Sequence, residues 1–198
     1  MNVVIIDYKA GNTRSVQFAL ARLGVAAQLR QEAAIIQAAD RVIFPGVGAA
    51  GWAMEQLAAR GLTAVIPALQ QPVLGICLGM QLLCAHSEEG AVPGLGVFPT
   101  TVRALQPTPL YNVPHVGWNT LAGRQDSPLL KDIPNGSSFY FVHSYAVPTT
   151  DYTSAEAVHG STFSAMLERD NFYATQFHPE KSGALGAKIL ENFMQLKD

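Results

Sequence analysis

Cys77 lies between two glycines in the segment Gly75-Ile-Cys-Leu-Gly79, directly after an apolar run. In G-x-S-x-G sequences a strand turns sharply into a helix, and the flanking glycines remove the Cβ atoms that would clash at the turn. The same spacing around a cysteine predicts a turn that lifts the sulfur clear of the sheet. The N-terminus of the following helix then favours the nucleophilic thiolate form of the cysteine. The alternative is a small core residue, as most free cysteines are. The paired glycines favour the nucleophile.

A nucleophilic cysteine needs a base, and the base needs an orienting group. His178 ends an apolar run and precedes Pro179, so we expect it in an extended conformation. Side chains two residues apart in an extended chain lie on the same face, which would let Glu180 accept a hydrogen bond from the His178 ring. The sequence therefore predicts a triad of Cys77, His178 and Glu180, drawn from two distant segments. An exposed or otherwise partnered histidine is the alternative for His178 taken alone.

A glycine-rich turn follows a second apolar run, where Gly46, Gly48 and Gly51 form a G-x-G-x-x-G pattern. A dinucleotide site would also need an acidic residue about 20 positions further on, and that region reads PALQQP. We therefore expect no cofactor. Glycine turns also expose backbone N–H groups that can stabilise an oxyanion. We expect an oxyanion hole of Gly46, Val47, Gly48 and Leu78, with the Val47 and Leu78 amides as donors; an ordinary turn is the alternative.

The second cysteine, Cys84, follows Cys77 by seven residues in a segment with a helical pattern. A helix would separate the two by about 10.5 Å, and a disulfide needs Cα atoms within about 7 Å. We expect Cys84 in the core, without a disulfide. Two cysteines are also too few to indicate a metal site, and they make a reducing, cytoplasmic location the default.

Composition limits the classes of partner. The chain has 198 residues, 48% of them hydrophobic and 14% charged, which favours one globular domain over residues 1–198. The net charge is −2 and lysine and arginine do not cluster, so we expect no nucleic-acid partner. Apolar runs stay well short of the ~20 residues that span a bilayer, so we expect no membrane partner.

The elements that must position the triad alternate between strand and helix patterns. Apolar runs at 2–7, 41–44 and 72–76 predict strands, and residues 12–24, 51–60, 63–70 and 78–87 have helical patterns. Continuous apolar strands separated by helices indicate a parallel sheet covered on both faces, whose carboxyl edge would hold both triad segments. Residues 91–132 indicate loops and short strands. Strands are predicted at 138–147, 162–167 and 172–177, and a closing helix at 183–196.

The motifs PGVG, GICLGMQLL and FHPEKS, in this order, resemble the class I (triad-type) glutamine amidotransferases. The segments DYKAGNTRSV, PHVGWN and YFVHSY narrow the resemblance to the glutaminase subunits of imidazole glycerol phosphate synthases. The resemblance implies an α/β, flavodoxin-like fold: a mostly parallel central sheet flanked by helices on both faces, with an additional antiparallel β region. Lys9 departs from the pattern, because the family usually has glycine there.

The resemblance also implies an activity and a partner. The chain would hydrolyse L-glutamine to glutamate and ammonia without a cofactor or metal. The ammonia would pass to a cyclase subunit, a (βα)8 barrel in a heterodimer, which forms imidazole glycerol phosphate and AICAR from PRFAR in histidine biosynthesis. By resemblance the substrate would contact Gly48, Gln81, Glu89, Ser144 and Tyr145. The partner would face Asn12, His115, Trp118, Tyr140 and Lys181.

Three other functions are consistent with parts of the sequence. A glutaminase subunit of another synthase, such as that for pyridoxal phosphate, would share the triad, but the PHVGWN segment disfavours it. A non-catalytic binding module on the same fold would lack a triad member, and all three are present. An unrelated cysteine hydrolase fits the histidine–proline–glutamate order less well. Without the resemblance, Glu89 would be interpreted as a solvent-exposed residue at a helix end. Trp118 could equally lie in the core.

Overall fold

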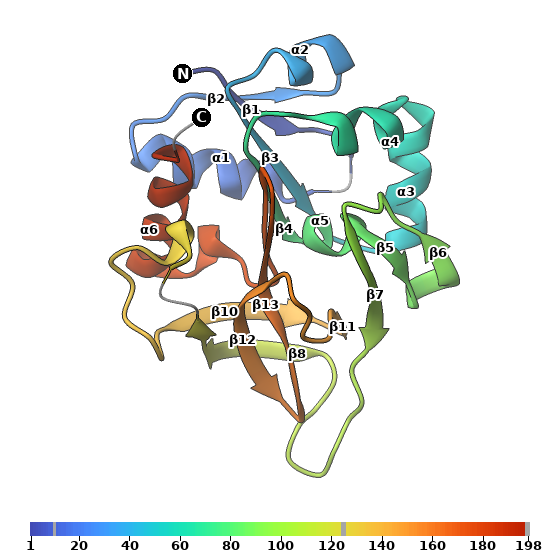
Figure 1. Cartoon of the computed structure of the whole chain (residues 1–198), viewed down its shortest axis with the longest axis vertical. Helices are drawn as coiled ribbons and strands as arrows, with labels where there is room; N and C mark the ends of the chain where they lie inside the picture. The colour runs from blue at the N-terminus through green and yellow to red at the C-terminus, as the bar shows by residue number, and fades with distance from the viewer. Residues whose placement is uncertain (10, 124–125, 197–198) are drawn as a thin grey trace.

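The structure, a computed structural model, describes residues 1–9, 11–123 and 126–196. Its centre is an eight-stranded mixed sheet in the order β2-β1-β3-β4-β14-β13-β12-β9 (Figure 1). Five neighbouring strands are parallel: β2 (Ala27–Arg30), β1 (Val3–Ile6), β3 (Arg41–Gly46), β4 (Val73–Cys77) and β14 (Phe172–Thr175). The antiparallel strands β13 (Ser161–Arg169), β12 (Thr153–His159) and β9 (Ala122–Gly123) extend this sheet.

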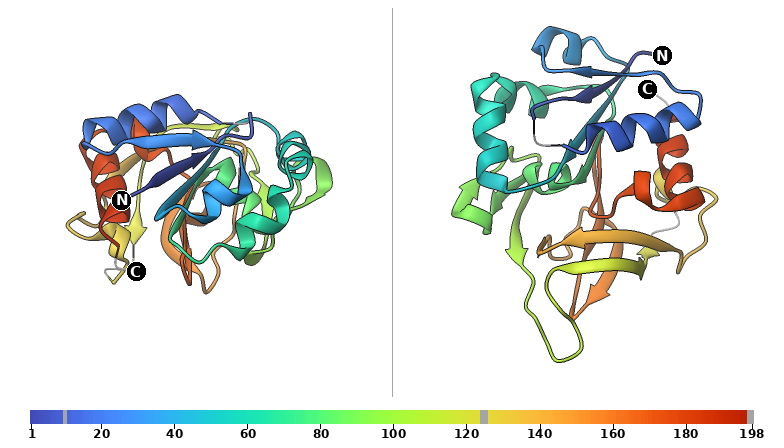
Figure 2. Two further views of the ribbon diagram at one scale, coloured as in Figure 1. Left: turned by 90° about the horizontal axis from the view of Figure 1, so that it is seen from above. Right: turned by 180° about the vertical axis from the view of Figure 1, so that it is seen from behind.

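Both faces of the parallel strands are buried, which explains why they are apolar throughout. Along β1, Val3 and Ile5 belong to one hydrophobic cluster and Val4 and Ile6 to another, because alternate side chains point to opposite faces. Figure 2 shows α1 and α6 on one face and α3 and α4 on the other. The bounds are α1 (Thr13–Arg22), α6 (Gly183–Met194), α2 (Ala33–Gln37), α3 (Ala50–Ala59) and α4 (Leu62–Val65). The expected doubly covered sheet is confirmed.

Two further sheets form the additional β region. In the first, β8 (His115–Thr120) pairs antiparallel with β10 (Ser138–His143). The second has the order β11-β7-β5-β6 and comprises β11 (Tyr145–Ala146), β7 (Phe98–Ala104), β5 (Cys84–Ser87) and β6 (Val92–Pro93). The strand expected over 138–147 is therefore two strands, because the chain leaves one sheet after His143 and joins the other at Tyr145.

The helix expected over 78–87 is also wrong in its second half. Helix α5 covers only Leu78–Leu82, and the chain continues as β5, which pairs with β6 and β7. Elsewhere the helix expected over 63–70 is α4 followed by the 3-10 turn η1 (Ile66–Ala68). Strands β2 and β12 and helix α2 were not expected. The remaining 3-10 turns are η2 (Glu89–Ala91), η3 (Pro128–Leu130) and η4 (Pro179–Lys181).

No helix in the described part of the chain is long and apolar enough to cross a membrane.

Candidate active site

Cys77 is the last residue of β4 and immediately precedes α5, so the strand-to-helix turn that the sequence predicts is present. Its φ of 55° and ψ of −110° lie in a region that non-glycine residues rarely adopt. A Cβ on Gly79 would overlap the carbonyl oxygen of Phe44, and one on Gly75 would lie 2.8 Å from Leu83 Cδ1. Glycine at both positions therefore lets α5 pack directly against β3 and β4.

His178 and Glu180 form a buried pair in which His178 Nδ1 lies 2.8 Å from Glu180 Oε1. The expected pairing is present, but its expected backbone is wrong. His178 itself is extended, whereas Glu180 lies in the 3-10 turn η4. The His178 backbone is fixed on both sides, since its N–H donates to Tyr140 O at 2.9 Å and its carbonyl accepts a hydrogen bond from Ser182 Oγ at 2.7 Å.

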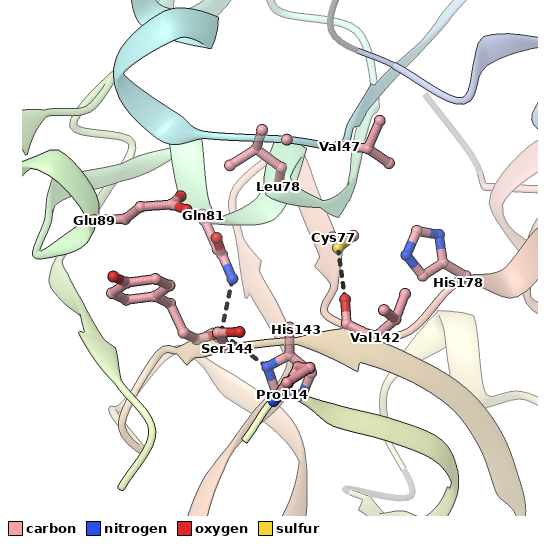
Figure 3. Close-up of a pocket in the computed structure, with 12 residues that line it drawn as sticks. Val47, Cys77, Leu78, Gln81, Glu89, Pro114, Val142, His143, Ser144 and His178 are labelled. Carbon is pink, nitrogen blue, oxygen red and sulfur yellow. Dashed lines mark hydrogen bonds between the residues drawn. The ribbon is translucent and has the colours of Figure 1, made fainter. Parts of the chain in front are cut away.

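The surroundings of His178 favour its protonated form. Burial lowers the pKa of the ring, but the Cys77 sulfur and the Glu180 carboxylate raise it by more, to about 9. Because Nδ1 faces the carboxylate, Nε2 is the nitrogen left for the reaction, and this atom has no hydrogen-bond partner among the described residues. Figure 3 shows the His178 ring beside Cys77 at the edge of one pocket. The arrangement suits a positively charged imidazole beside the sulfur.

This raised pKa predicts how stability depends on pH. The folded pKa of His178 exceeds the unfolded value of about 6.5, so its contribution is complete below pH 6.5 and is lost as the pH rises toward 9. We expect urea unfolding to show a falling free energy over this window, by at most about 1.4 kcal/mol per pH unit from this group. Glu180→Gln should make the fall shallower, because it removes one cause of the shift. The same slope in both proteins would contradict the ion-pair assignment.

The Cys77 sulfur is held by two groups besides its position on the turn. It donates to the carbonyl of Val142 at 3.8 Å and accepts from Gln176 Nε2 at 3.8 Å. Neither partner was expected from the sequence. Gln176 is fully buried, and the one sequence signal for it was an amide inside the apolar run that precedes His178.

Cys84 has the expected environment. It is buried and free, its Sγ donates to Met80 O at 3.6 Å, and burial raises the pKa of its thiol to about 12. A protonated, buried thiol of this kind is inert. Cys77 is also free, so the expected absence of a disulfide is confirmed.

A cavity of about 300 Å³ borders Cys77 and His178 (Figure 3). Its size suits a small metabolite. All five residues expected to contact the substrate line it, together with Val47 and Leu78 from the expected oxyanion hole. Glu89 is anchored there because its Oε2 accepts a hydrogen bond from the Ala50 N–H at 2.9 Å, at the start of α3. The complete lining is Val47, Gly48, Cys77, Leu78, Gln81, Glu89, Pro114, Val142, His143, Ser144, Tyr145 and His178.

Three of the four residues expected in the oxyanion hole line the cavity, and the fourth, Gly46, is packed behind it. Gly46 does not line the cavity; it is packed so closely that a Cβ there would lie 2.6 Å from the Tyr8 hydroxyl. Gly48 lines the cavity and has a φ of 96°, which favours glycine. Leu78 is the first residue of α5, so its N–H has no acceptor within the helix.

The residues expected to face a partner gather mainly on the outer face of β8 and β10. Trp118 is 59% exposed and lies opposite Tyr140 in the register, with the rings 6.2 Å apart. Lys181 Nζ lies 6.0 Å from the Tyr140 ring centroid. Asn12 is on a different element, at the N-cap of α1. Trp118 is thus exposed and not a core residue.

His115 differs from the expectation of a partner-facing ring. It is only 4% exposed, and its Nδ1 lies 2.9 Å from Nε2 of the buried His143. The reason is strand alternation: Val116 and Trp118 point outward from β8, so the flanking His115 points inward.

Residues 4–196 match the family described as "Glutamine amidotransferase class-I". The chain belongs to the class I glutamine amidotransferases. The class I assignment and the flavodoxin-like fold that the motifs implied are therefore confirmed, and the chain is a member of an enzyme family. Lys9, which occupies the position of a usual family glycine, has a φ of 70° in the region that favours glycine.

Curated relatives of this class I amidotransferase cover it from end to end. It is 52% identical over 197 residues to the "Imidazole glycerol phosphate synthase subunit HisH" of Bacteroides thetaiotaomicron, covering 99% of this chain and 100% of the relative. The protein of the same name from Pectobacterium atrosepticum is 49% identical over 197 residues, with the same coverage.

Solved structures of lower identity share the fold of this class I amidotransferase. A GMP synthase subunit homologue from Thermoplasma acidophilum superposes with a TM-score of 0.75 at 18% identity, covering 98% of this chain and 92% of that one. A chain of PurLQS from Thermotoga maritima gives a TM-score of 0.71 at 18% identity, covering 98% of this chain and 97% of that one.

Proposed function

We propose that this chain is the glutaminase subunit of an imidazole glycerol phosphate synthase. It hydrolyses L-glutamine and passes the ammonia to a (βα)8 cyclase subunit, which forms imidazole glycerol phosphate and AICAR from PRFAR in histidine biosynthesis. Relatives with the name of that subunit match the full length at about half identity, which supports the choice of synthase. The observation that carries the activity is the buried His178–Glu180 pair beside the Cys77 turn, at one cavity.

The geometry supports the following reaction. The Cys77 thiolate attacks the side-chain amide carbon of glutamine, and the Val47 and Leu78 N–H groups stabilise the tetrahedral oxyanion. His178 donates its Nε2 proton to the departing nitrogen, so ammonia leaves and a thioester remains. The neutral ring then takes a proton from water, whose oxygen attacks the thioester and releases glutamate and the thiolate. Glu180 stabilises the imidazolium through Nδ1.

The cavity offers complementary groups for the two ends of a free amino acid. Glu89 supplies a carboxylate for the α-ammonium group. Ser144 connects β10 to β11 and Tyr145 begins β11, and the two supply the neutral wall for the α-carboxylate. Gln81 supports this cavity wall, because its Nε2 already donates to Tyr145 O at 2.8 Å and lies 3.0 Å from Gln176 Oε1.

The outer face of β8 and β10 is the proposed cyclase contact. It presents Val116, Trp118, Tyr140 and Val142, an apolar group that is unusual for a solvent-facing surface. Aromatic residues are the commonest anchors of protein interfaces. Val142 also lines the active-site cavity, so this face adjoins the place where ammonia forms.

The cytoplasmic location of the chain stays a prediction.

One titration tests both the activity and the partner. Adding the cyclase subunit to this chain should raise ammonia release from glutamine to a plateau at equimolar amounts. Trp118→Ala should shift the half-saturating cyclase concentration upward by about 30-fold or more, since anchors of this kind contribute about 2 kcal/mol or more. Trp52→Ala, which removes the 45% exposed tryptophan of α3, is the matched control and should leave the titration unchanged.

Two results would contradict the proposal. Absence of ammonia release from glutamine when both the cyclase and PRFAR are present would exclude the glutaminase assignment. Equal titrations for the Trp118 variant and the parent chain would exclude this face as the contact.

A further inference from the structure

Three hydrogen-bonded side chains, His143, His115 and Asn119, lie behind the active-site cavity and are called the relay. His143 lines the cavity wall, and its Nδ1 lies 2.8 Å from the carbonyl oxygen of Tyr145. A carbonyl only accepts hydrogen bonds, so Nδ1 carries the proton and, in the neutral ring, Nε2 is an acceptor. His115 Nδ1 lies 2.9 Å from that Nε2 and must therefore be the donor. The two contacts together fix one tautomer for each ring.

The relay continues toward the protein surface. With its Nδ1 protonated, His115 has an acceptor at Nε2, which faces Asn119 Nδ2 at 3.4 Å. Asn119 is half-buried, and its Nδ2 also donates to Val158 O at 2.9 Å. Burial lowers the pKa of His143 to about 3 and that of His115 to about 4, so both rings are neutral near pH 7. Neutrality keeps the direction of the hydrogen bonds constant.

The hydrogen bonds from the two histidines and those that lead to the thiol share one acceptor, the Tyr145 carbonyl oxygen. The carbonyl of Tyr145 accepts from His143 and also from Gln81 Nε2 at 2.8 Å. Gln81 contacts Gln176 Oε1 at 3.0 Å, and Gln176 Nε2 donates to the Cys77 sulfur. A continuous set of hydrogen bonds therefore joins the two histidines to the nucleophile.

The position of Tyr145 in the chain explains why such a tie is needed. The chain changes sheets here, from β10 paired with β8 to β11 paired with β7. His143 is the last residue of the first sheet, and its side chain reaches forward over Ser144 to the first residue of the second. It thus holds the connection whose residues line the cavity.

We propose that His143, with its tautomer set by His115, is a positioning residue of the glutaminase site. It places the Ser144–Tyr145 wall where the amino-acid end of glutamine binds. This inference rests on the proposed glutaminase function. A role in packing alone is the competing explanation, because His115 stacks between Phe141 and His159 with ring centroids 5.0 and 4.0 Å away.

Steady-state kinetics of the complex with the cyclase separate the two explanations. His143→Leu keeps a side chain of comparable size but removes the donor to Tyr145, so kcat/KM for glutamine should fall roughly 10- to 100-fold, mainly through KM. His143→Asn keeps an N–H near the position of Nδ1 and should recover kcat/KM to within about fivefold of the parent. Alkylation of Cys77 by iodoacetamide needs no substrate wall, and its rate should change less than about threefold in either variant.

His159→Leu is the matched control. Its ring stacks on His115 in the same cluster, but its hydrogen bond to Asn112 O, at 2.7 Å, lies outside the relay. This variant should keep KM within about threefold of the parent. A pure packing role predicts the reverse order, with His143→Leu tolerated and His143→Asn impaired, and that order would overturn the proposal.

The tautomer can be read from the parent chain without any substitution. Long-range ¹H–¹⁵N correlation spectra should show His143 protonated at Nδ1 and unprotonated at Nε2, and the opposite tautomer would overturn the proposal even if a variant fails to fold. The outcomes also separate this inference from the function beneath it. An inactive parent complex would refute the proposed function, whereas an active parent with an equally active His143→Leu variant would refute only the positioning role.

Discussion

Cys77→Ala should abolish glutamine-dependent synthesis while synthesis from added ammonia continues. The substitution removes the atom that forms the thioester, and no other described thiol lines the cavity. Loss of a nucleophile from a triad costs several orders of magnitude, so we expect glutamine hydrolysis to fall by at least about 10³-fold. From the glutaminase subunit the cyclase needs only ammonia, which the medium then supplies.

The measurement is product formation by the complex with glutamine or an ammonium salt as nitrogen source. Cys84→Ala is the control, because it removes a buried thiol that lies outside the cavity, and it should retain activity with both sources. Glutamine turnover by the Cys77 variant at the parent rate would reject the nucleophile. Loss of the ammonia-dependent activity as well would show that the substitution damages the complex.

Gly79→Ala should prevent normal folding or destabilise the chain by more than about 3 kcal/mol. A Cβ at this position would overlap the backbone carbonyl of Phe44, so the contact cannot be relieved by turning a side chain. Separating α5 from β3 would disturb the packing beneath the nucleophile and leave apolar surface unpaired. The expected effect is thus large for the addition of one methyl group.

Gly51→Ala is a matched substitution with the opposite expectation. Gly51 lies in α3, and its added Cβ would come no closer than 3.6 Å to Val92 Cγ1. Alanine in a helix is favoured over glycine by about 0.5–1 kcal/mol, so this variant should be as stable as the parent or more so. Urea unfolding measures both variants. A Gly79 variant within about 1 kcal/mol of the parent would show that the α5–β3 contact is not as close as described.

The Cys77 turn and the His178–Glu180 pair of the proposed triad could be predicted, because each depends on local sequence. The glycine spacing that permits the Cys77 turn is contained in five residues, and Glu180 is close enough in the chain to reach His178 in more than one backbone conformation. The pairing was therefore predicted correctly even though the extended geometry assumed for it was wrong. The parallel sheet was predictable for a similar reason, since strands buried on both faces are apolar throughout.

The features that could not be predicted depend on distant partners. Residues 84–87 continue a helical pattern but form β5, because β6 and β7 offer hydrogen bonds to that segment. The break between His143 and Tyr145 is decided by two different neighbours, β8 and β7. The inward orientation of His115 depends on which face of β8 is covered. Gln176 and Val142 reach Cys77 only through the assembled fold.

In β10 the same residues contact the active site through their backbone and form the exposed face through their side chains. The carbonyl of Val142 accepts a hydrogen bond from Cys77 Sγ and that of Tyr140 accepts one from the His178 N–H, while both side chains belong to the exposed face. A displacement of this strand by anything bound outside would alter the groups around the sulfur. Thermodynamic reciprocity then applies: by whatever factor an outer ligand changes the affinity for glutamine, glutamine changes the affinity for that ligand by the same factor.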